Sequence, residues 1–413
     1  MKSGILVQHG HSPIKKSGEV RSDILAIIGF ISEDLWPEDV RRYDVTGQER
    51  NEEENARFAT ELGDFVELLL FKESDLYAHP FFSCIDGATT KGVQNFFANG
   101  GKQVHVFGIC IQSIEQLSLQ VDLEIILGPL FDHLRSDEEI ALICSPALAY
   151  LPVEMDRSGE ITSNAENFYK AMLSHCNEMN NRFAIFDAPY GLHDIYIQKW
   201  IQSFRQTLGD VASYGAIYYP WLCYQDEVFP PSGSMAGLFV RVENDHPPNG
   251  IQWPPANYPL NRVTHLENEM DWSEAEKYVN VSINPILTQA GRGVVPLGAR
   301  TLSTQSAFQF INTRRILNLI VEQVRRDNQW AVFETNNTHL WSVLQRDIRY
   351  RLGRYWSQGL LTESNEGEKY HVKCDELNNP KALRDSGFVN IEIRVQPVGA
   401  VEQIVIDLNI GGS

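Results

Sequence analysis

Short apolar segments that alternate with helical stretches constrain the fold of this chain most strongly. The run LAIIGFI at residues 25–31 is apolar throughout, which is typical of a strand buried on both faces. Three more such segments follow, with helices predicted near 120–134, 164–180 and 191–208. These segments are EEIALICS, RFAIFD and YGAIYYP. Strands that alternate with helices predict an α/β core around a largely parallel sheet.

Two segments of the N-terminal half complete this predicted core. Residues 53–71 carry apolar side chains at helical spacing, so we predict a helix there. Those side chains are Phe58, Leu62, Phe65, Val66 and Leu69. The segment TKGVQNFFANGGKQVHVFGICI predicts a helix, a stop at Gly100 and Gly101, and then a strand. Glycine readily adopts the left-handed conformation that ends many helices.

The C-terminal third has a different pattern. Residues 306–326 and 338–357 predict amphipathic helices, with a strand NQWAVFE between them. The segment GFVNIEIRV alternates apolar with polar side chains, which predicts a half-buried antiparallel strand. We therefore expect an α/β fold (α+β overall) in which an α/β core is followed by a C-terminal domain of sheet and helices.

Both ends of the chain are strand-like and lie beyond flexible joints. The apolar strands are predicted at 3–8 and 402–410, and the joints at 11–18 and 396–401. An isolated terminal strand cannot satisfy its own backbone groups. Each strand therefore either folds back onto its own sheet, which is the usual case, or pairs with another subunit by strand addition. Two such ends in one chain weaken the usual interpretation.

The composition excludes several functional classes. A formal net charge of −19 disfavours nucleic acid and anionic membranes as general partners. The N-terminus lacks the long apolar core of a signal peptide, and the apolar runs are too short to span a bilayer. The six cysteines are scattered without a CxxC pair, which argues against a zinc site or a disulfide framework and fits a reducing cytoplasm.

The sequence offers little support for a catalytic site. The chain has no P-loop, dinucleotide fingerprint, HExxH pair or GxSxG elbow, so Ser234 is a poor nucleophile candidate. Asp86, Asp187 and Asp226 follow apolar segments, where we interpret them as turn residues. We expect no catalytic residue, no cofactor and no bound metal.

The segment GRGVVPLGARTL at 291–302 poses the question of a phosphate site. Its glycines precede a strand, so no helix N-terminus follows to bind an anion. An arginine here can equally hold carbonyl groups or a carboxylate at a domain junction. We therefore predict a structural joint without a ligand, formed by Gly291, Gly293, Gly298 and Arg300.

Eight stretches of the chain, in order, resemble the tail sheath protein family of contractile phages and related contractile injection systems. The first five are GVQNFFANGGKQVHVF, DEEIALICSPAL, RFAIFDAP, AIYYPWL, and PPSGSMAGLFVRVE with WPPAN. The last three are NPILTQAGRGVVPLGARTL with the helical segments after it, KYHVKCDELNNP, and VNIEIRVQPVGAVEQIVI. Each stretch alone is weak, but together they cover almost the whole chain.

This resemblance implies a helical polymer around an inner tube. In such a polymer, an N-terminal and a C-terminal strand of neighbouring subunits complete the C-terminal sheet of a third subunit. We expect an exchange strand and linker at 1–18, a sheath core at 19–283, a C-terminal sheath domain at 284–396 and a second exchange strand at 397–413. The residues expected in the exchanged strands are Ile5, Leu6, Val7, Ile404, Val405, Ile406 and Leu408.

The resemblance also implies the partners and the mechanism. The partners are further copies of this chain, an inner tube protein, and baseplate and cap proteins, with no nucleic acid and no direct membrane insertion. Assembly is expected in the cytoplasm, as part of a phage tail or tail-like particle that is released from the cell or attached to a membrane through other components. Contraction is then a switch between two packings of one polymer that drives the tube through a target envelope, without nucleotide hydrolysis.

Two alternatives stay open. Leu297 stands where the family usually has tryptophan, which keeps open a minor sheath subunit near the baseplate or cap that does not itself form the contracting cylinder. The second alternative is a soluble α/β enzyme whose site the sequence does not reveal. Such an enzyme would be a monomer or a small closed oligomer.

Helix 338–357 is the candidate surface for the inner tube. Residues 284–360 hold ten arginines, no lysine and four acidic residues, which gives this region a net charge of +6. We hypothesise that the helix lies against an acidic band of the tube. The alternative is a solvated face, with Asp347 and Arg351 as a local ion pair. The tube-facing candidates are Arg346, Arg349 and Arg354.

Overall fold

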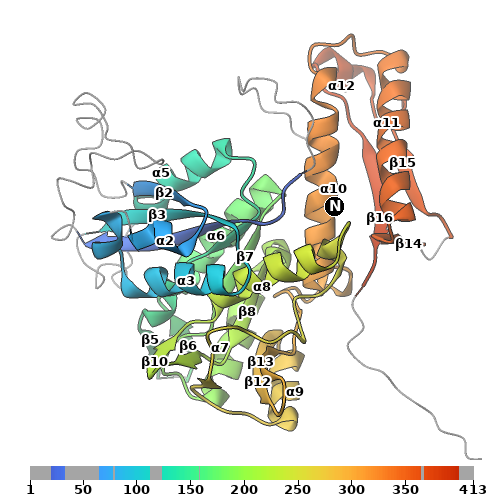
Figure 1. Cartoon of the computed structure of the whole chain (residues 1–413). Coiled ribbons are helices and arrows are strands. Elements are labelled where there is room, and N and C mark those ends of the chain that lie inside the picture. The colour runs from blue at the N-terminus through green and yellow to red at the C-terminus, as the bar shows by residue number, and fades with distance from the viewer. Residues whose placement is uncertain are drawn as a thin grey trace, which may run out of the picture.

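The chain folds into an α/β core and a C-terminal domain that stands beside it (Figure 1). The computed structural model describes residues 20–32, 65–77, 80–111, 123–157, 159–363 and 367–399. The predicted strands at 3–8 and 402–410 lie outside the described residues. The general architecture of mixed helices and sheets is as the sequence predicts.

The core is built on an eight-stranded sheet. Its central strands are parallel, and an antiparallel strand closes each edge. The order of the strands is β13 (Gly293–Pro296), β12 (Ile283–Gln289), β8 (Gly215–Tyr219), β7 (Phe183–Asp187), β4 (Leu142–Cys144), β1 (Ile24–Ser32), β3 (Gln103–Ile111) and β2 (Phe65–Leu70).

Strand β1 shows why the sheet is buried on both faces. Successive side chains of a strand point to opposite faces, so an apolar run supplies two cores at once. Ile24, Ala26 and Ile28 pack into one apolar cluster. Leu25 and Ile27 pack into the cluster on the other face.

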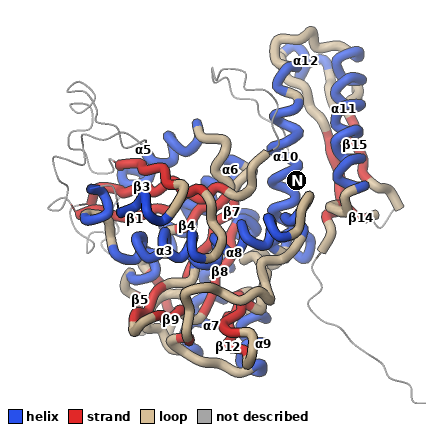
Figure 2. The backbone as a smooth tube through the Cα atoms, in the orientation of Figure 1, coloured by secondary structure: helices blue, strands red, loops and turns tan. Residues whose placement is uncertain are grey.

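Helices cover both faces of the sheet, as predicted from the alternation of segments (Figure 2). Helices α3 (Gly87–Ala98) and α8 (Ser232–Asp245) are in close contact at Gly92 and Gly233. A Cβ on Gly233 would lie only 2.4 Å from the Gly92 carbonyl oxygen. The first cluster is covered by α5 (Leu123–Ser136), α6 (Glu166–Met179) and α7 (Asp194–Gln206), and the second by α3 (Gly87–Ala98) and α8 (Ser232–Asp245).

Short elements complete the core. A small sheet of β9, β10 and β11 lies beside the main one, and β5 pairs with β6. The bounds are α2 (Glu73–Tyr77), β5 (Val153–Met155), β6 (Ile161–Ser163), β9 (Leu222–Tyr224), β10 (Glu227–Phe229), β11 (His265–Leu266) and α9 (Trp272–Asn280).

The C-terminal domain pairs two long helices with a three-stranded sheet. Helix α11 begins where the Asn337 side chain accepts a hydrogen bond from the Leu340 backbone N–H at 3.0 Å, the usual N-cap arrangement. Strand β16 pairs antiparallel with β14 and β15, which confirms the antiparallel strand predicted from GFVNIEIRV, although it begins only at Glu392. The elements are α10 (Ile311–Asp327), α11 (Thr338–Ser357), β14 (Leu361–Thr362), β15 (Tyr370–Lys373), α12 (Lys381–Asp385) and β16 (Glu392–Pro397).

Two predictions of secondary structure are wrong. Residues 65–70 form the edge strand β2 rather than part of a helix, because pairing along β3 overrides the helical spacing of their apolar side chains. The segment NQWAVFE is no strand but a 3₁₀ turn at Gln329–Ala331, followed by Phe333 at φ +75°. Phe333 is 92% exposed, so apolar content alone misidentified this connection.

The domain boundary also differs from the expectation at residue 284. Strand β12 pairs in parallel with β8, and β13 pairs with β12, so both belong to the core sheet. The core therefore extends to Pro296. The C-terminal domain follows the connecting residues 297–310.

Candidate functional site

Helix α10 joins the two parts of the molecule and has two unlike faces. Its apolar face holds Ile316, Ile320 and Val324, which pack against Ile348 and Leu352 of α11. The opposite face lies against the core and is polar, although its side chains are buried. The polar residues buried along α10 are Asn312, Thr313, Arg314, Arg315, Asn318, Glu322 and Gln323.

The first contact of this polar face holds the segment that leads into β1. Arg315 donates hydrogen bonds to the Ser22 carbonyl oxygen at 2.8 Å and to a Glu243 carboxylate oxygen at 2.9 Å. Gln323 accepts a hydrogen bond from the Val20 backbone N–H at 3.0 Å. The described chain therefore enters the core sheet directly beside α10.

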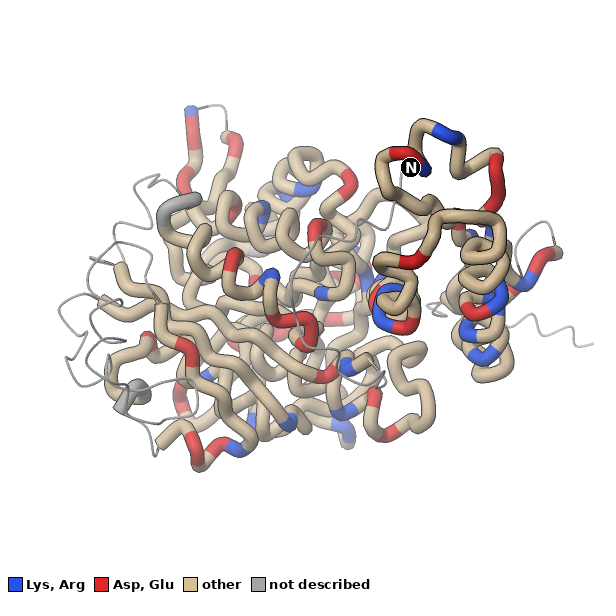
Figure 3. Tube along the Cα trace, turned by 90° about the horizontal axis from the view of Figure 1, so that it is seen from above, with Lys and Arg blue, Asp and Glu red and all other residues tan. Residues whose placement is uncertain are grey.

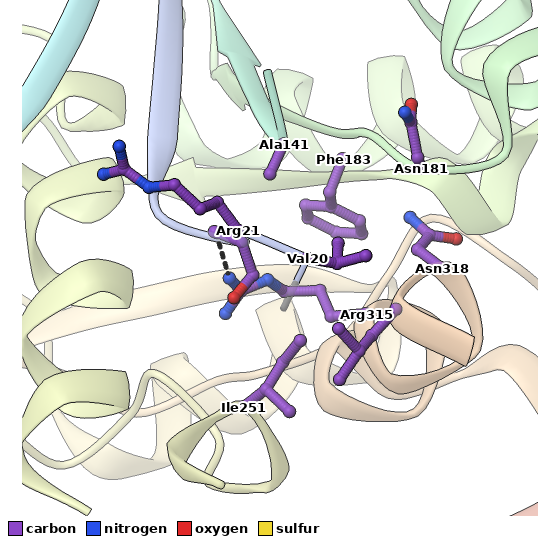
Figure 4. Close-up of a pocket in the computed structure, with 10 residues that line it drawn as sticks. Val20, Arg21, Ala141, Asn181, Phe183, Ile251, Arg315 and Asn318 are labelled. Atoms are coloured by element: carbon purple, nitrogen blue, oxygen red, sulfur yellow. Dashed lines mark hydrogen bonds between the residues drawn. The ribbon is translucent and has the colours of Figure 1, made fainter. Parts of the chain in front are cut away.

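A small hollow opens between α10 and the beginnings of β4 and β7 (Figure 4). The side chains of Arg315 and Asn318 come to it from α10, and Phe183 and Asn181 from the core. Its lining mixes apolar with polar groups. The two surfaces thus meet without the continuous apolar packing found inside the core.

A second contact connects α10 to a buried arginine. The Asn318 side chain donates a hydrogen bond to the Arg182 carbonyl oxygen at 2.8 Å. The Arg182 guanidinium is fully buried and donates to the carbonyl oxygens of Leu134 and Ile140 at 2.5 and 3.2 Å. Burial lowers the pKa of Arg182 to about 10. Its bonds fix the loops at the amino ends of the strands, against which α10 rests.

A third contact is an ionic cluster at the end of α10. Glu322 is buried and accepts hydrogen bonds from Arg325 at 2.9 Å and Arg326 at 2.5 Å. The same arginines contact Glu138 of the core. Arg325 lies 2.7 Å from the Glu138 carboxylate, and Arg326 donates to the Glu138 carbonyl oxygen at 2.9 Å. Burial opposes the charge of Arg325, but the hydrogen bonds that it donates to the carboxylates of Glu138 and Glu322 leave its pKa above the usual value.

Arg314 makes a fourth contact of another kind. Its guanidinium lies between two aromatic rings, 4.3 Å from the centre of Tyr214 and 4.5 Å from that of Phe308. Burial lowers its pKa below the usual value. Stacking of this kind tolerates sliding better than a directional hydrogen bond does.

The polar face of α10 was not identified from the sequence. Its residues recur every three or four positions, as in Arg315, Asn318 and Glu322. In a sequence this pattern is indistinguishable from a solvated helix face. The only signal was the mixture of amides with arginines where an exposed helix usually carries lysine and glutamate.

The predicted joint divides into two features. Gly291 and Gly293 have φ of +76° and +84° and form the turn between β12 and β13, inside the core sheet. Gly298 and Arg300 lie on the segment that leaves the sheet. There Asn284 accepts from the Arg300 backbone N–H at 2.6 Å and donates to its carbonyl oxygen at 2.8 Å. A Cβ on Gly298 would lie 2.6 Å from the Asn284 side-chain oxygen, so only glycine fits there.

The predicted aspartates have local contacts. Asp86 accepts hydrogen bonds from Thr89 N–H at the start of α3 and from Phe30 N–H, and the segment Pro80–Ser83 before it forms a 3₁₀ turn. Asp187 ends β7 and accepts from Ser232 N–H at 2.7 Å. Asp226 has φ +65° in the turn between β9 and β10. Ser234 is buried within α8.

The basic helix α11 is observed over the residues predicted. Its apolar stripe is buried and includes Trp341, Leu344, Ile348, Leu352 and Tyr355. Figure 3 shows basic residues along the helix at the end of the molecule away from the core. None of the described helices is long and apolar enough to cross a bilayer.

The three candidate arginines of α11 differ in their surroundings. Arg346, whose side chain is 72% exposed, pairs with its neighbour Asp347, whereas Arg349 donates to the Val372 carbonyl oxygen. Arg354 is exposed. The ion pair of Asp347 with Arg351, which belonged to the alternative of a solvated face, is not formed. Arg351 instead contacts Asp327 of α10 at 2.6 Å.

Comparison with known proteins finds tail sheath proteins that are similar to this chain. Residues 303–411 match the phage tail sheath C-terminal domain family. The tail sheath protein of Vibrio phage KVP40 is 27% identical over 183 residues, which are 43% of this chain but only 26% of that protein. The chain thus spans about a quarter of the length of this relative.

Solved structures share the fold over the whole chain. The contracted sheath of the extracellular contractile injection system PVC matches with a TM-score of 0.67 at 19% identity, over 100% of this chain and 98% of that one. A chain of the anti-feeding prophage baseplate matches with a TM-score of 0.65 at 18% identity, over 99% of both chains. The chain thus matches phage tail sheath proteins in its C-terminal region and shares the fold of a contractile sheath structure along its length.

Proposed function

We propose that the chain is a structural subunit of a contractile sheath, which polymerises helically around an inner tube and contracts to drive that tube through a target envelope. The observation that carries the proposal is a fold shared with a contracted sheath over the full length of the chain. The relatives matched in sequence are sheath proteins as well. Besides further copies of itself, the subunit would contact the tube, a baseplate and a cap.

Strand addition is the proposed connection between subunits. Among the described strands, β14 and β15 each pair with β16 alone, so the C-terminal sheet is small. Such a sheet offers backbone groups for added strands. Residues 3–8 and 402–410 of neighbouring subunits would supply those strands, with Ile5, Val7 and Ile404 among the side chains that enter apolar pockets.

The junction at α10 supports the proposed contraction. A polar interface between domains is typical of parts that move relative to one another. The core would swing on the contacts of Arg315, Asn318 and Glu322, while the terminal strands stay paired. Contraction would then release free energy stored during assembly, and the subunit would need no nucleotide.

Terminal deletions test the proposed connection. Removal of residues 1–10, or of 402–413, should leave a folded monomer because the eight strands of the core sheet lie between residues 24 and 296. Polymerisation should fail, because every connection of that type is lost at once. Sedimentation reports assembly, and circular dichroism reports folding. Loss of the folded signal would mean that the strands belong to the subunit's own core, and long sheaths would mean that they are dispensable.

Single prolines probe the same strand more sharply. Proline at Val405 or Ile406 removes a backbone donor and blocks pairing with little change in hydrophobicity. Amides alternate sides along a strand, so at least one of the two variants should prevent assembly. Alanine at the same positions is the matched control, because it retains the donor. Equal assembly of both proline variants and their controls would contradict strand addition.

A minor sheath subunit is the second candidate. The match to a chain of the anti-feeding prophage baseplate supports it as directly as the sheath match supports the first candidate. The two differ in the product of assembly. A major subunit forms long cylinders that shorten, whereas a minor one forms a ring or a short cap.

A further inference from the structure

Four side chains with potential metal ligands lie together beside β2, the edge strand of the core sheet (Figure 1). Three come from regular elements, Glu67 from β2, His105 from β3 and His133 from α5, and the fourth, Asp137, directly follows α5. Nothing in the assembly role described above uses them.

Their ligand atoms are already close to one another. Glu67 contacts His105 Nδ1 with one carboxylate oxygen at 2.5 Å and His133 Nε2 with the other at 2.9 Å. An Asp137 oxygen lies 3.9 Å from His105 Nδ1. The ligand atoms of Glu67, His105 and Asp137 all lie within 4.8 Å of one another.

These distances suit a single bound ion. With bonds of about 2.0–2.2 Å to nitrogen and oxygen, the ligand atoms of a tetrahedral zinc site lie about 3.3 Å apart. The observed separations of 2.5, 2.9 and 3.9 Å bracket that value. The ligand atoms of Glu67, His105 and Asp137 would therefore surround one centre after small rotations. His133, which contacts the other Glu67 oxygen, would turn toward that centre to supply a fourth donor.

We propose that Glu67, His105, His133 and Asp137 bind one divalent transition-metal ion, of which Zn²⁺ is the best-fitting representative. Two imidazole nitrogens select such ions over Mg²⁺ and Ca²⁺, which prefer oxygen ligands alone. On binding, the metal replaces any proton on each ligating nitrogen, and the two carboxylates balance its charge.

The surroundings of the cluster fit a structural site. The side chains of Glu67 and His105 are only 8% and 10% exposed, so the ion would be largely shielded from water. His133 is 41% exposed, which leaves a path for entry.

The ion would tie β2 to the rest of the core. Strand β2 lies at the edge of the sheet, where β3 is its only strand partner among the described residues. A metal shared by β2, β3 and α5 fixes this edge through side chains as well as backbone bonds. Metal binding should therefore stabilise the folded chain by mass action.

The test measures Zn²⁺ binding to the full chain, with any affinity tag removed and prior metal stripped by a chelator. Wild type should bind one Zn²⁺ per chain in calorimetric titration and by elemental analysis after gel filtration. His133→Ala and Asp137→Asn should each bind at least about tenfold more weakly, because each removes one ligand. His265→Ala changes an exposed histidine elsewhere on the core and should bind as wild type does.

Two further measurements decide the outcome. Co²⁺ should give the visible spectrum of a four-coordinate site with wild type and lose it with His133→Ala. Mg²⁺ should not compete with Zn²⁺ at equal concentration. Absence of stoichiometric Zn²⁺ binding by wild type would overturn the proposal, as would equal affinity in wild type and His133→Ala. His133 is partly exposed, so its replacement should leave the fold intact, which circular dichroism checks.

Discussion

The core sheet and the junction between α10 and the core are both buried, but by different kinds of side chain. On both faces of the sheet, between the strands and the covering helices, apolar side chains such as Ile27, Phe186 and Trp200 exclude water almost completely. Along α10, the buried side chains are mainly amides, arginines and a glutamate. The core therefore depends on shape and apolar area, whereas the junction depends on directional polar contacts.

This difference has an energetic consequence. Full burial of a large apolar side chain stabilises a fold by about 1.5–3 kcal/mol relative to exposure. A single hydrogen bond contributes about 0.5–1.5 kcal/mol net, because water replaces it when it is lost. Separation of α10 from the core thus costs much less per residue than opening the core. Two arrangements of the C-terminal domain relative to the core can therefore lie close in free energy, because they differ only in the polar contacts of this junction.

A substitution inside the core should have the largest effect. Phe186 is fully buried in β7 and packs on Tyr169 with ring centres 4.3 Å apart. Phe186→Ala should lower the free energy of unfolding by about 3–5 kcal/mol through lost burial and a cavity. Phe186→Leu, the control, should cost less than about 1.5 kcal/mol. Denaturant titration of the monomer measures both, and a loss below 1 kcal/mol for alanine would contradict an apolar, closely packed core.

A carboxyl group inside the core makes stability depend on pH. Burial raises the pKa of Asp187 from 3.8 to about 7. The folded chain thus holds this proton to higher pH than the unfolded chain does. The contribution of Asp187 to stability is complete at low pH and is lost as the pH rises from about 4 to about 7.

Asp187→Asn should remove this dependence, because an amide does not ionise but still accepts the hydrogen bond from Ser232. The stability of Asp187→Asn relative to wild type should rise between about pH 5 and about pH 8, by on the order of 2 kcal/mol. Thermal unfolding across this range provides the measurement. A constant difference would mean that Asp187 is ionised in the fold throughout.

A substitution at the junction should act locally. Asn318→Ala removes the hydrogen bond to the Arg182 carbonyl oxygen and should lower the free energy of unfolding by only about 1 kcal/mol. Amide exchange near residues 20–22 and 182–183 should accelerate, while exchange in β1 stays slow. Val321→Ala, at an exposed position of the same helix, is the control. Uniform acceleration throughout the core would show that the junction is not a separable unit.

Charge reversal on α11 should affect the monomer least. Arg346→Glu with Arg349→Glu should change monomer stability by about 0.5 kcal/mol or less, because both side chains lie at the surface. Assembly around the inner tube should nevertheless be impaired, more strongly at low salt, because salt screens exposed charges. Lys199→Glu with Lys277→Glu makes the same change of charge on the core and should assemble normally. Normal co-assembly of the α11 variant would exclude the tube-facing role.

Sequence patterns predicted the elements that bury one continuous apolar surface. Strands β1, β7 and β8 and helix α11 lie where the spacing of apolar side chains places them. Edge strand β2 was misassigned, because six residues of FVELLL fit a helix or a strand equally well until a partner is known. The strand predicted at NQWAVFE was wrong for a different reason. Its apolar content fits a strand, but the segment forms a 3₁₀ turn that pairs with no described strand.

Features that depend on distant residues left no pattern in the sequence. The cluster of Glu67, His105, His133 and Asp137 is assembled by the pairing of β2 with β3 and the packing of α5. Only His133 and Asp137, four residues apart, show a spacing that could have suggested a site. In the sequence, the polar residues of α10 have the same spacing as a solvent-exposed helix face. Only the structure shows that the core covers them.

Negative-stain microscopy of the purified chain, alone and with its inner tube protein, tests the central claim most directly. Long cylinders that exist in an extended form around the tube and in a shorter, wider form after a contraction stimulus are the predicted result. Rings or caps that never elongate would identify a minor sheath subunit instead. A uniform population of monomers or small closed oligomers, at concentrations where the folded chain is intact, would contradict the proposal that this chain builds a contractile sheath.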